Sequence, residues 1–168
     1  MPRCRPHLIM PEYSKTLFSA GCDAGVVSHC EKVAEVAARY VGESVDSELV
    51  HAGAMLHDIG RSKTHSIKHA AKGAKICRRL ELSEDIVKIV GRHTGAGLTE
   101  DESVLLSLSP VSVVPETLEE KIVAHADNLV SGSREVTIYQ RMMQIADLPA
   151  GSKRKIWRLS MEVELLAE

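Results

Sequence analysis

Apolar residues recur at intervals of three and four along almost the whole chain, and strict alternation of apolar and polar residues is nearly absent. This spacing puts apolar side chains on one face of an α-helix, whereas alternation is typical of a β-strand. We therefore predict an all-α fold of about seven to eight helices. The longer helices are expected near residues 24–41, 47–60, 67–80, 84–93, 118–131, 134–147 and 152–166, and shorter ones near 11–20 and 100–107.

Several helix ends are marked by residues that suit them. Gly60 is expected to end its helix in the left-handed conformation that glycine adopts without strain, so that the backbone turns there. Glu102 and Glu120 each follow a threonine by three residues, which is the pattern of a capping box. The expected N-caps, whose side-chain oxygens accept hydrogen bonds from the first helical turn, are Asp23, Asp46 or Ser47, Ser83, Thr99 and Thr117.

A chain of 168 residues with 44% apolar residues is long enough to bury a core, and a single domain is the expectation. We expect a poorly ordered tail at residues 1–10 and one domain at 11–168. Within it, the motifs fall in a core at 24–131, followed by C-terminal helices at 134–168. The last helix is expected to pack on the same domain or on a second subunit, so a homodimer is one expectation.

The bulk charge and the cysteines exclude several classes of protein. A net charge of −2 gives no overall excess of cations, so binding to duplex nucleic acid or to a membrane surface is not expected, although local basic patches are compatible with it. No stretch is apolar enough for a signal peptide or a membrane span, which favours a cytoplasmic location. The four cysteines lack C-x-x-C pairing, which argues against a disulfide framework and against structural zinc.

The strongest chemical signal is the tetrapeptide His57-Asp58-Ile59-Gly60 at the end of a predicted helix. An adjacent imidazole and carboxylate can both reach one metal ion if the backbone turns after them. His29 lies on the apolar stripe of another predicted helix, and Asp127 flanks the apolar face of a third. Each could separately be a hydrogen-bonded core residue, but side chains of these types are costly to bury without a partner, and together they favour a metal site.

Two imidazoles and two carboxylates form a mixed nitrogen and oxygen ligand set that leaves positions open for water. Such a set suits Mn, Fe, Co, Ni, Zn or Mg, and an open site is typical of catalysis rather than of a structural metal. His125 is left out of the set because it precedes Asp127 by two residues, which on a helix turns its side chain away.

The order His29, then His57-Asp58, then Asp127 resembles the pattern of the HD superfamily of metal-dependent phosphohydrolases, over about residues 24–131. The chain is also similar to the short stand-alone HDIG proteins of archaea. The resemblance implies an all-helical core and hydrolysis of phosphomonoesters or phosphodiesters by metal-activated water. Its implied cofactor is a divalent ion, one or two per site, and its implied partner is a small phosphorylated substrate, with nucleotides as the leading class.

His69 and His93 are similar to the added ligands of two-metal HD proteins, including the HD-GYP cyclic-dinucleotide phosphodiesterases. In that arrangement, the resemblance implies that Asp58 bridges two ions. The pattern also departs from that subgroup, because Arg92 stands where a second histidine is expected and the GYP signature is absent. A substrate contact or a helix-capping role is the alternative for both histidines.

Arg61, Lys63 and His65 follow the HD pair directly. Cationic side chains at this point would orient a bound phosphate and offset the charge that develops in the transition state, and His65 could protonate the leaving group. We therefore assign catalytic roles to Asp58, Arg61, Lys63 and His65, with a solvated loop as the alternative for the last three.

The predicted activity is metal-dependent hydrolysis of a phosphoester. One alternative is a non-catalytic HD module that binds a nucleotide or a metal ion as a sensor. Another is a di-iron oxygenase of HD type, because such enzymes use related ligand sets; it predicts redox-active iron.

Overall fold

The structure is a computed structural model that describes residues 13–166. These residues contain nine α-helices, which confirms the all-α class; the number exceeds the prediction because both short segments form helices. The expected tail at residues 1–10 lies outside the described residues. The helices are α1 (Tyr13–Ala20), α2 (Ala24–Ala37), α3 (Ser47–Leu56), α4 (His69–Arg79), α5 (Glu84–Arg92), α6 (Glu100–Leu105), α7 (Leu118–Asn128), α8 (Ile138–Gln144) and α9 (Ala150–Leu166). Two 3-10 turns, η1 (Ala38–Tyr40) and η2 (Ile59–Ser62), and two strands, β1 (Val130–Ser131) and β2 (Arg134–Glu135), complete the fold.

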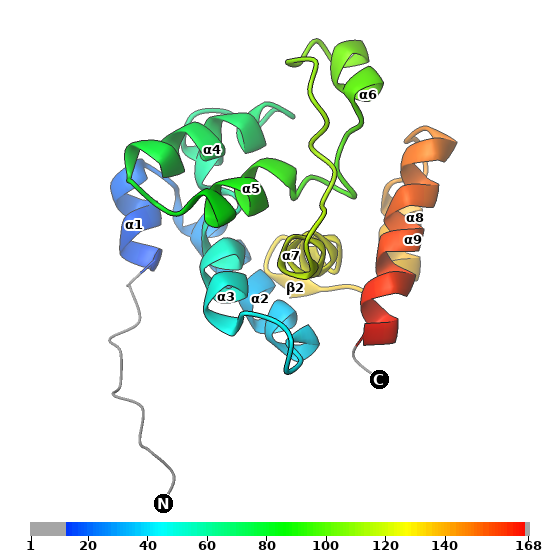
Figure 1. Ribbon diagram of the computed structural model, residues 1–168, viewed down its shortest axis with the longest axis horizontal. Helices are drawn as coiled ribbons and strands as arrows, with labels where there is room; N and C mark the ends of the chain where they lie inside the picture. Colours follow the sequence, from blue (N-terminus) through cyan, green and yellow to red (C-terminus); the bar gives the residue numbers. More distant parts are fainter. Residues whose placement is uncertain (1–12, 167–168) are drawn as a thin grey trace, which may run out of the picture.

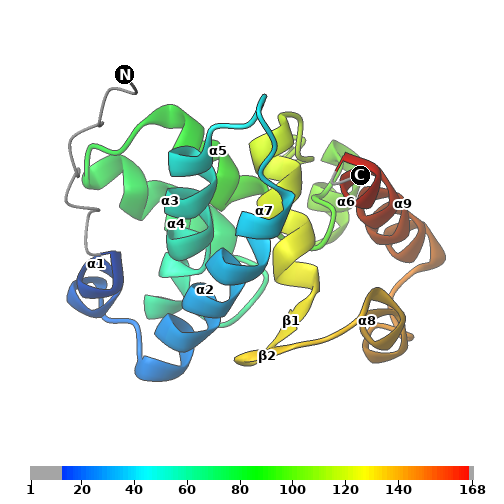
Figure 2. The ribbon, with the colours of Figure 1, turned by 90° about the horizontal axis from the view of Figure 1, so that it is seen from below.

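Helix α7 runs through the centre of the molecule (Figures 1 and 2). Helices α2 and α3 pack along one side of it, and α9 packs on the other side. Helices α4 and α5 form a hairpin that lies beside α3. Ile156, Leu159 and Val163 bury one face of α9 in the same apolar cluster as Ile122 of α7, so the last helix packs on the domain that carries the motifs.

Two apolar clusters hold the helices together, and α2 contributes to both. Val33 and Val36 belong to the cluster shared with α7 and α9, whereas Cys30 belongs to the cluster shared with α1, α4 and α5. The first half of α2, which carries His29, is therefore fixed between two packed regions. Burial of these side chains is what positions the residues of the site.

The N-caps follow the sequence prediction, with one difference in detail. Side-chain oxygens of all five predicted positions accept a backbone N–H of the first turn, with Asp46 as the cap of α3. Thr99 and Glu102 form a complete capping box. At Thr117 only half of the box is present, because the carboxylate of Glu120 instead accepts hydrogen bonds from Arg92 and from the backbone N–H of Glu116.

The prediction of helices at 118–131 and 134–147 is wrong between residues 129 and 137. Helix α7 ends at Asn128, and the chain then forms the antiparallel hairpin of β1 and β2 before α8 begins. Gly132 makes the turn with a φ of +62°, a conformation that glycine adopts readily. Two-residue strands are too short to produce alternation in the sequence, so the pattern could not reveal them.

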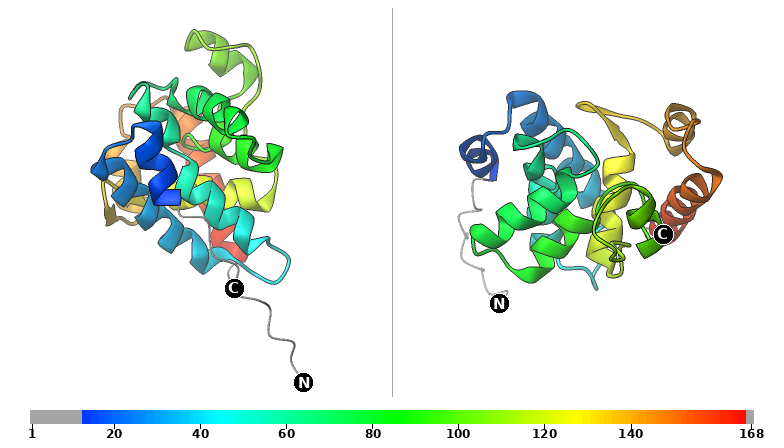
Figure 3. Two further views of the ribbon diagram at one scale, coloured as in Figure 1. Left: turned by 90° about the vertical axis from the view of Figure 1, so that its left-hand side faces the viewer. Right: turned by 90° about the horizontal axis from the view of Figure 1, so that it is seen from above.

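An arm formed by residues 98–115 carries α6 away from the body of the molecule (Figure 3). Its base is fixed at Gly97, where a side chain would overlap the backbone of Val113 and Val114. Elsewhere, Cys22, Cys30 and Cys77 are buried and free. Within residues 13–166, no helix is long and apolar enough to cross a membrane.

Candidate metal centre

The HD pair lies at the turn between α3 and η2. His57 follows the last residue of α3, Asp58 precedes η2, and both side chains are buried. Gly60 does not adopt the left-handed conformation that the sequence suggested. A Cβ atom there would lie 1.9 Å from the carbonyl oxygen of His69, so a glycine is required because η2 packs directly against the start of α4.

His29 and Asp127 approach the HD pair from α2 and α7. Nε2 of His29 lies 3.0 Å from Oδ1 of Asp127, and Nε2 of His57 lies 3.5 Å from the same oxygen. Oδ2 of Asp58 lies 3.7 Å from Nε2 of His29 and 3.8 Å from Nε2 of His57. The fold therefore brings together the four side chains that the sequence singled out.

His69 and His93 lie on the other side of Asp58. Nε2 of His69 is 3.2 Å from Oδ1 of Asp58, and Nε2 of His93 is 3.5 Å from it. The two oxygens of Asp58 thus face different pairs of histidines. In residues 13–166, every group of potential metal ligands falls within this cluster: His29, His57 and Asp58; His57, His93 and Asp127; and Asp58, His69 and His93.

All four histidines are oriented by a backbone carbonyl. Nδ1 of His29 donates to Gly132, that of His57 to Ala54, that of His69 to Ser66 and that of His93 to Val90, at 2.6–2.8 Å. A carbonyl oxygen can only accept, so Nδ1 of each ring carries a proton and Nε2 faces the centre. This orientation and this kind of outer hydrogen bond are typical of metal-ligating histidines.

The charges in the cluster favour a cation. The imidazoles around Asp58 outweigh the effect of its burial and hold the pKa of this carboxyl well below its usual range, so it is ionised. Burial lowers the pKa of His93 despite the nearby Asp58, which keeps the ring neutral. Oδ1 of Asp58 is buried and accepts no hydrogen bond from residues 13–166. An ionised oxygen buried among imidazole nitrogens is costly unless a positive charge lies between them, and these are ligands that divalent metal ions take, so the residues fit such ions.

One side of the cluster reaches solvent. The side chains of His29 and Asp127 are 15% and 23% exposed, whereas those of His57 and His93 are at most 1% exposed. A substrate would therefore approach from the side of His29 and Asp127. Exposure of these two side chains gives water a route to the cluster, which a catalytic metal site needs.

The loop after the HD pair contributes one contact to the cluster. Nε of Arg61 donates to Oδ2 of Asp58, and the side chain is 31% exposed. Lys63 and His65 are exposed and belong to none of the ligand groups. His125 points away from the centre, as predicted, and its Nε2 lies 3.1 Å from Glu164 of α9.

Two features that orient the site were not predicted from the sequence. The guanidinium of Arg141, on α8, donates to the carbonyl oxygens of Asn128 and Val130 and thereby caps the end of α7 that carries Asp127. The carbonyl of Gly132 orients His29. A backbone carbonyl leaves no signal in a sequence, and Arg141 reads as an ordinary charge on an amphipathic helix.

The fold and the cluster define an all-helical domain built around buried histidines and aspartates. The HD domain family matches residues 26–132, well over half of the chain. The chain belongs to this family, and the recognition made from the ligand order is thereby confirmed.

Known proteins similar to the chain agree with this assignment. The uncharacterized protein MJ0778 of Methanocaldococcus jannaschii is 49% identical over 123 residues, which are 70% of this chain and 73% of that protein. The tRNA (cytidine(56)-2'-O)-methyltransferase of Picrophilus torridus is 50% identical over 127 residues, which are 75% of this chain but only 37% of that protein. The crystal structure of the L. monocytogenes phosphodiesterase PgpH HD domain in complex with cyclic-di-AMP has a TM-score of 0.56 at 17% identity, and the match covers 92% of this chain and 94% of that one.

Proposed function

We propose that this chain is a metal-dependent phosphohydrolase that cleaves a phosphodiester of a nucleotide at a centre holding two divalent ions. The observation that carries the proposal is the position of Asp58, whose two carboxylate oxygens face different pairs of histidines. The HD family assignment supports a phosphohydrolase, and the cyclic-di-AMP complex of the PgpH domain supports a phosphodiester over a monoester.

In this proposal one ion is held by His29, His57, Asp58 and Asp127, and the second by Asp58, His69 and His93. Divalent ions at such a site supply Lewis acidity, which lowers the pKa of water and offsets charge on phosphate oxygens. His57, His69 and His93 are locked by their carbonyl partners, so they hold the ligand geometry without reorganisation.

Arg61 is proposed to have two roles. Its Nε donates to Asp58 and holds that carboxylate between the histidine pairs. Its terminal amino groups make no hydrogen bond to the described residues, so they remain available to bind a phosphate oxygen. Lys63 and His65 lie on the loop that follows the HD pair. We propose them for the same electrostatic task and for protonation of the leaving group.

The test is a metal count combined with turnover. Protein purified without added metal is analysed for bound ions, then assayed with Mn, Fe, Co, Ni, Zn and Mg on an aryl phosphodiester, an aryl phosphomonoester and cyclic dinucleotides. The wild type is expected to bind two ions and to hydrolyse the diesters. Asp58→Ala is expected to lose both turnover and metal, and the double variant His69→Ala, His93→Ala to retain one ion with reduced turnover.

His125→Gln is the matched control, because His125 is a buried histidine outside the cluster. It is expected to keep both ions and most of the activity. Unchanged turnover in Asp58→Ala would overturn the proposal. Two ordered ions with no hydrolysis of any ester would favour a sensor module, and dioxygen-dependent oxidation at bound iron would favour an oxygenase.

A further inference from the structure

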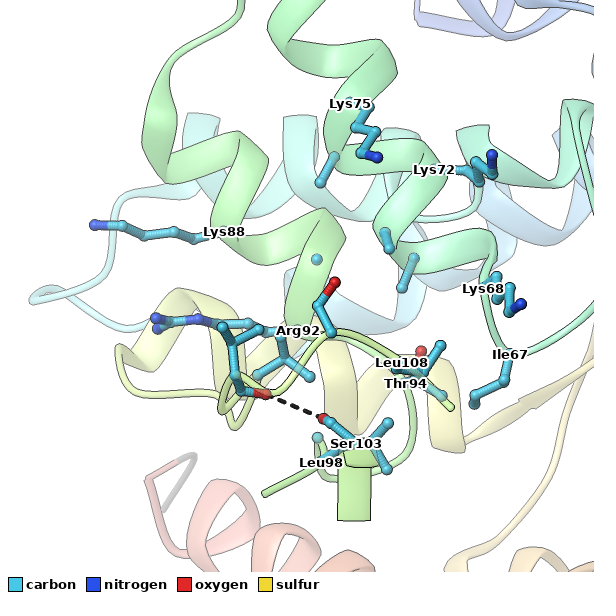
Figure 4. A pocket seen from close by; sticks show the side chains of 18 of the residues that line it. Ile67, Lys68, Lys72, Lys75, Lys88, Arg92, Thr94, Leu98, Ser103 and Leu108 are labelled. Carbon is cyan, nitrogen blue, oxygen red and sulfur yellow. Dashed lines mark hydrogen bonds between the residues drawn. The ribbon is translucent and has the colours of Figure 1, made fainter. Parts of the chain in front are cut away.

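A second concave site lies beside the metal centre, between the α4 and α5 hairpin and the arm of residues 98–115 (Figure 4). Its volume is about 570 Å³. None of the six proposed metal ligands lines this groove, but their sequence neighbours do: Lys68 precedes His69, and Thr94 follows His93. The groove is therefore distinct from the metal centre, and at Lys68 and Thr94 its lining is one residue along the chain from a proposed ligand.

The charge of the groove is strongly unbalanced. Six cationic side chains line it, and Glu84 is the only carboxylate among its lining residues. The whole chain has a net charge of −2, so this is a local concentration of positive charge. The cations are Lys68, Lys72, Lys75, Arg78, Lys88 and Arg92.

Three of these cations have no partner within residues 13–166. Arg78 pairs with Glu84, Lys88 with Asp85, and Arg92 with Glu116 and Glu120. The ammonium groups of the other three, all on or next to α4, make no ion pair or hydrogen bond to the described residues: Lys68, Lys72 and Lys75.

The unpaired lysines form a row. Their spacing of four and three residues places them on one face of the helix, as Figure 4 shows, and the rise of an α-helix puts the first and last about 10 Å apart. That length accommodates more than one phosphate of a nucleic-acid strand, because phosphates on one strand of a duplex repeat about every 3.4 Å along the axis and are further apart on an extended strand. A single phosphate would use only part of the row.

The rest of the groove suits bases and sugars. Its floor includes the small or apolar residues Ala70, Ala71 and Leu108, and the arm contributes serines. The hydroxyl oxygen of Thr94 is buried and has no hydrogen-bond partner, and Thr94 lines the end of the groove next to Ile67 and Lys68. A row of cations along a groove is one of the features by which proteins hold the backbone of single-stranded nucleic acid, and the small residues beside it leave space for sugars and bases.

We propose that this groove binds the backbone of a single-stranded oligonucleotide that extends from the phosphodiester held at the metal centre. The row of Lys68, Lys72 and Lys75 contacts successive phosphates. This inference rests on the proposed phosphodiesterase function and specifies its substrate as a strand longer than a dinucleotide.

The test separates the groove from the chemistry. Binding of a fluorescein-labelled single-stranded RNA of mixed sequence is measured by anisotropy on the metal-free full chain, in chelator, between about 50 and 200 mM salt. Turnover of the same RNA and of an aryl phosphodiester, which is too short to reach the lysines, is measured with metal. The variant is Lys72→Ala, Lys75→Ala, which changes only exposed residues of α4.

The variant is expected to weaken RNA binding roughly tenfold and to reduce the slope of log affinity against log salt by about 1.4, because two phosphate contacts are lost. Turnover of the aryl diester is expected to stay unchanged. The matched control is Arg154→Ala, Arg158→Ala, which removes two exposed cations from α9, away from the groove, and should leave RNA binding unchanged.

Equal RNA binding by the wild type and the lysine variant would overturn the proposal. Competition by a mononucleotide as effective as by unlabelled RNA would also overturn it, since one phosphate would then suffice, and so would tighter binding of duplex than of single strands. If the wild type cleaves no ester but binds RNA through the lysines, the proposed hydrolysis fails while the groove assignment stands.

Discussion

Nε2 of His69 lies 3.0 Å from Nε2 of His93, although each ring donates its Nδ1 proton to a backbone carbonyl. Two ring nitrogens at this distance repel each other unless a proton or a metal ion lies between them. The same relation holds between His29 and His57, whose Nε2 atoms are 3.3 Å apart. The packed helices hold both pairs in place, so this repulsion destabilises the folded protein unless a cation lies between the nitrogens.

Metal removal should therefore destabilise the protein. At a free metal concentration of about 100 times Kd, binding to the folded state adds about 2.7 kcal/mol per site, which for a domain of this size raises Tm by roughly 5–10 °C. Thermal unfolding with chelator and then with each divalent ion would measure the shift. Metal should raise the Tm of the His69→Ala, His93→Ala variant by less than it raises that of the wild type. A wild-type Tm that does not change when metal is added would contradict the two-ion site.

Gly60→Ala should destabilise the protein severely. The added Cβ would lie 1.9 Å from the carbonyl oxygen of His69 and 2.5 Å from the backbone nitrogen of Gly73, and neither backbone atom can move without shifting α4. We expect a loss of about 3 kcal/mol or more in the free energy of unfolding, together with weaker metal binding, because His69 moves with α4.

Gly42→Ala is the control, since a Cβ there meets nothing within 4 Å. Urea titrations of both variants would compare their free energies of unfolding. A Gly60→Ala protein as stable as Gly42→Ala would mean that η2 and α4 separate easily.

The meeting of His29, His57, Asp58 and Asp127 could be predicted because it depends on residue types placed on helix faces. His29 and Asp127 interrupt apolar stripes, and helical periodicity alone directs both toward the interior. His69 and His93 came only from a resemblance, because nothing in the local pattern around them distinguishes a ligand from a capping histidine. The structure places both beside Asp58.

What the sequence could not predict depends on contacts between distant backbone segments. The need for Gly60 arises from the packing of η2 on α4, which no local pattern records, so its reason was misread as a left-handed turn. The hairpin at Gly132 is too short to show alternation. The groove of unpaired lysines was also not predicted, because in the sequence Lys72 and Lys75 are ordinary surface charges, and the groove forms only where α4 and the arm lie together in the fold.

Arg141 should act as a positioning residue for Asp127. Arg141→Met removes the donors that cap the carbonyls of Asn128 and Val130, which frees the end of α7. Loss of outer hydrogen bonds of this kind lowers metal affinity by roughly tenfold or more. Isothermal titration with metal would measure this loss, and Arg141→Lys should recover only part of the affinity because it lacks the planar fork.

Arg39→Met provides the comparison. It breaks an exposed pair with Glu135, the residue of β2 that lies opposite Val130 in the hairpin, and such pairs contribute little. Metal affinity and stability should both stay close to those of the wild type. If Arg39→Met weakened metal binding as much as Arg141→Met, the hairpin as a whole, rather than the cap on α7, would orient the site.

Stability should fall in alkaline solution because of buried thiols. Burial raises the pKa of Cys77 from 9.0 to about 11. Between these values the unfolded chain loses a proton that the folded chain retains, so the thiol's full contribution to stability is present below pH 9 and decreases toward pH 11. Cys22 shifts in the same direction for the same main reason.

Urea unfolding at pH 7, 9 and 10 would measure this dependence, and Cys77→Ala isolates one thiol because the remaining groups titrate in both proteins. The decline in unfolding free energy between pH 9 and 10 should be shallower in the variant, by at most about 1.4 kcal/mol per pH unit. Native Cys77 should also resist a thiol reagent at pH 9 and react after unfolding. Identical pH slopes in the two proteins would show that Cys77 ionises as readily when folded as when unfolded, and that the packing around α4 admits solvent.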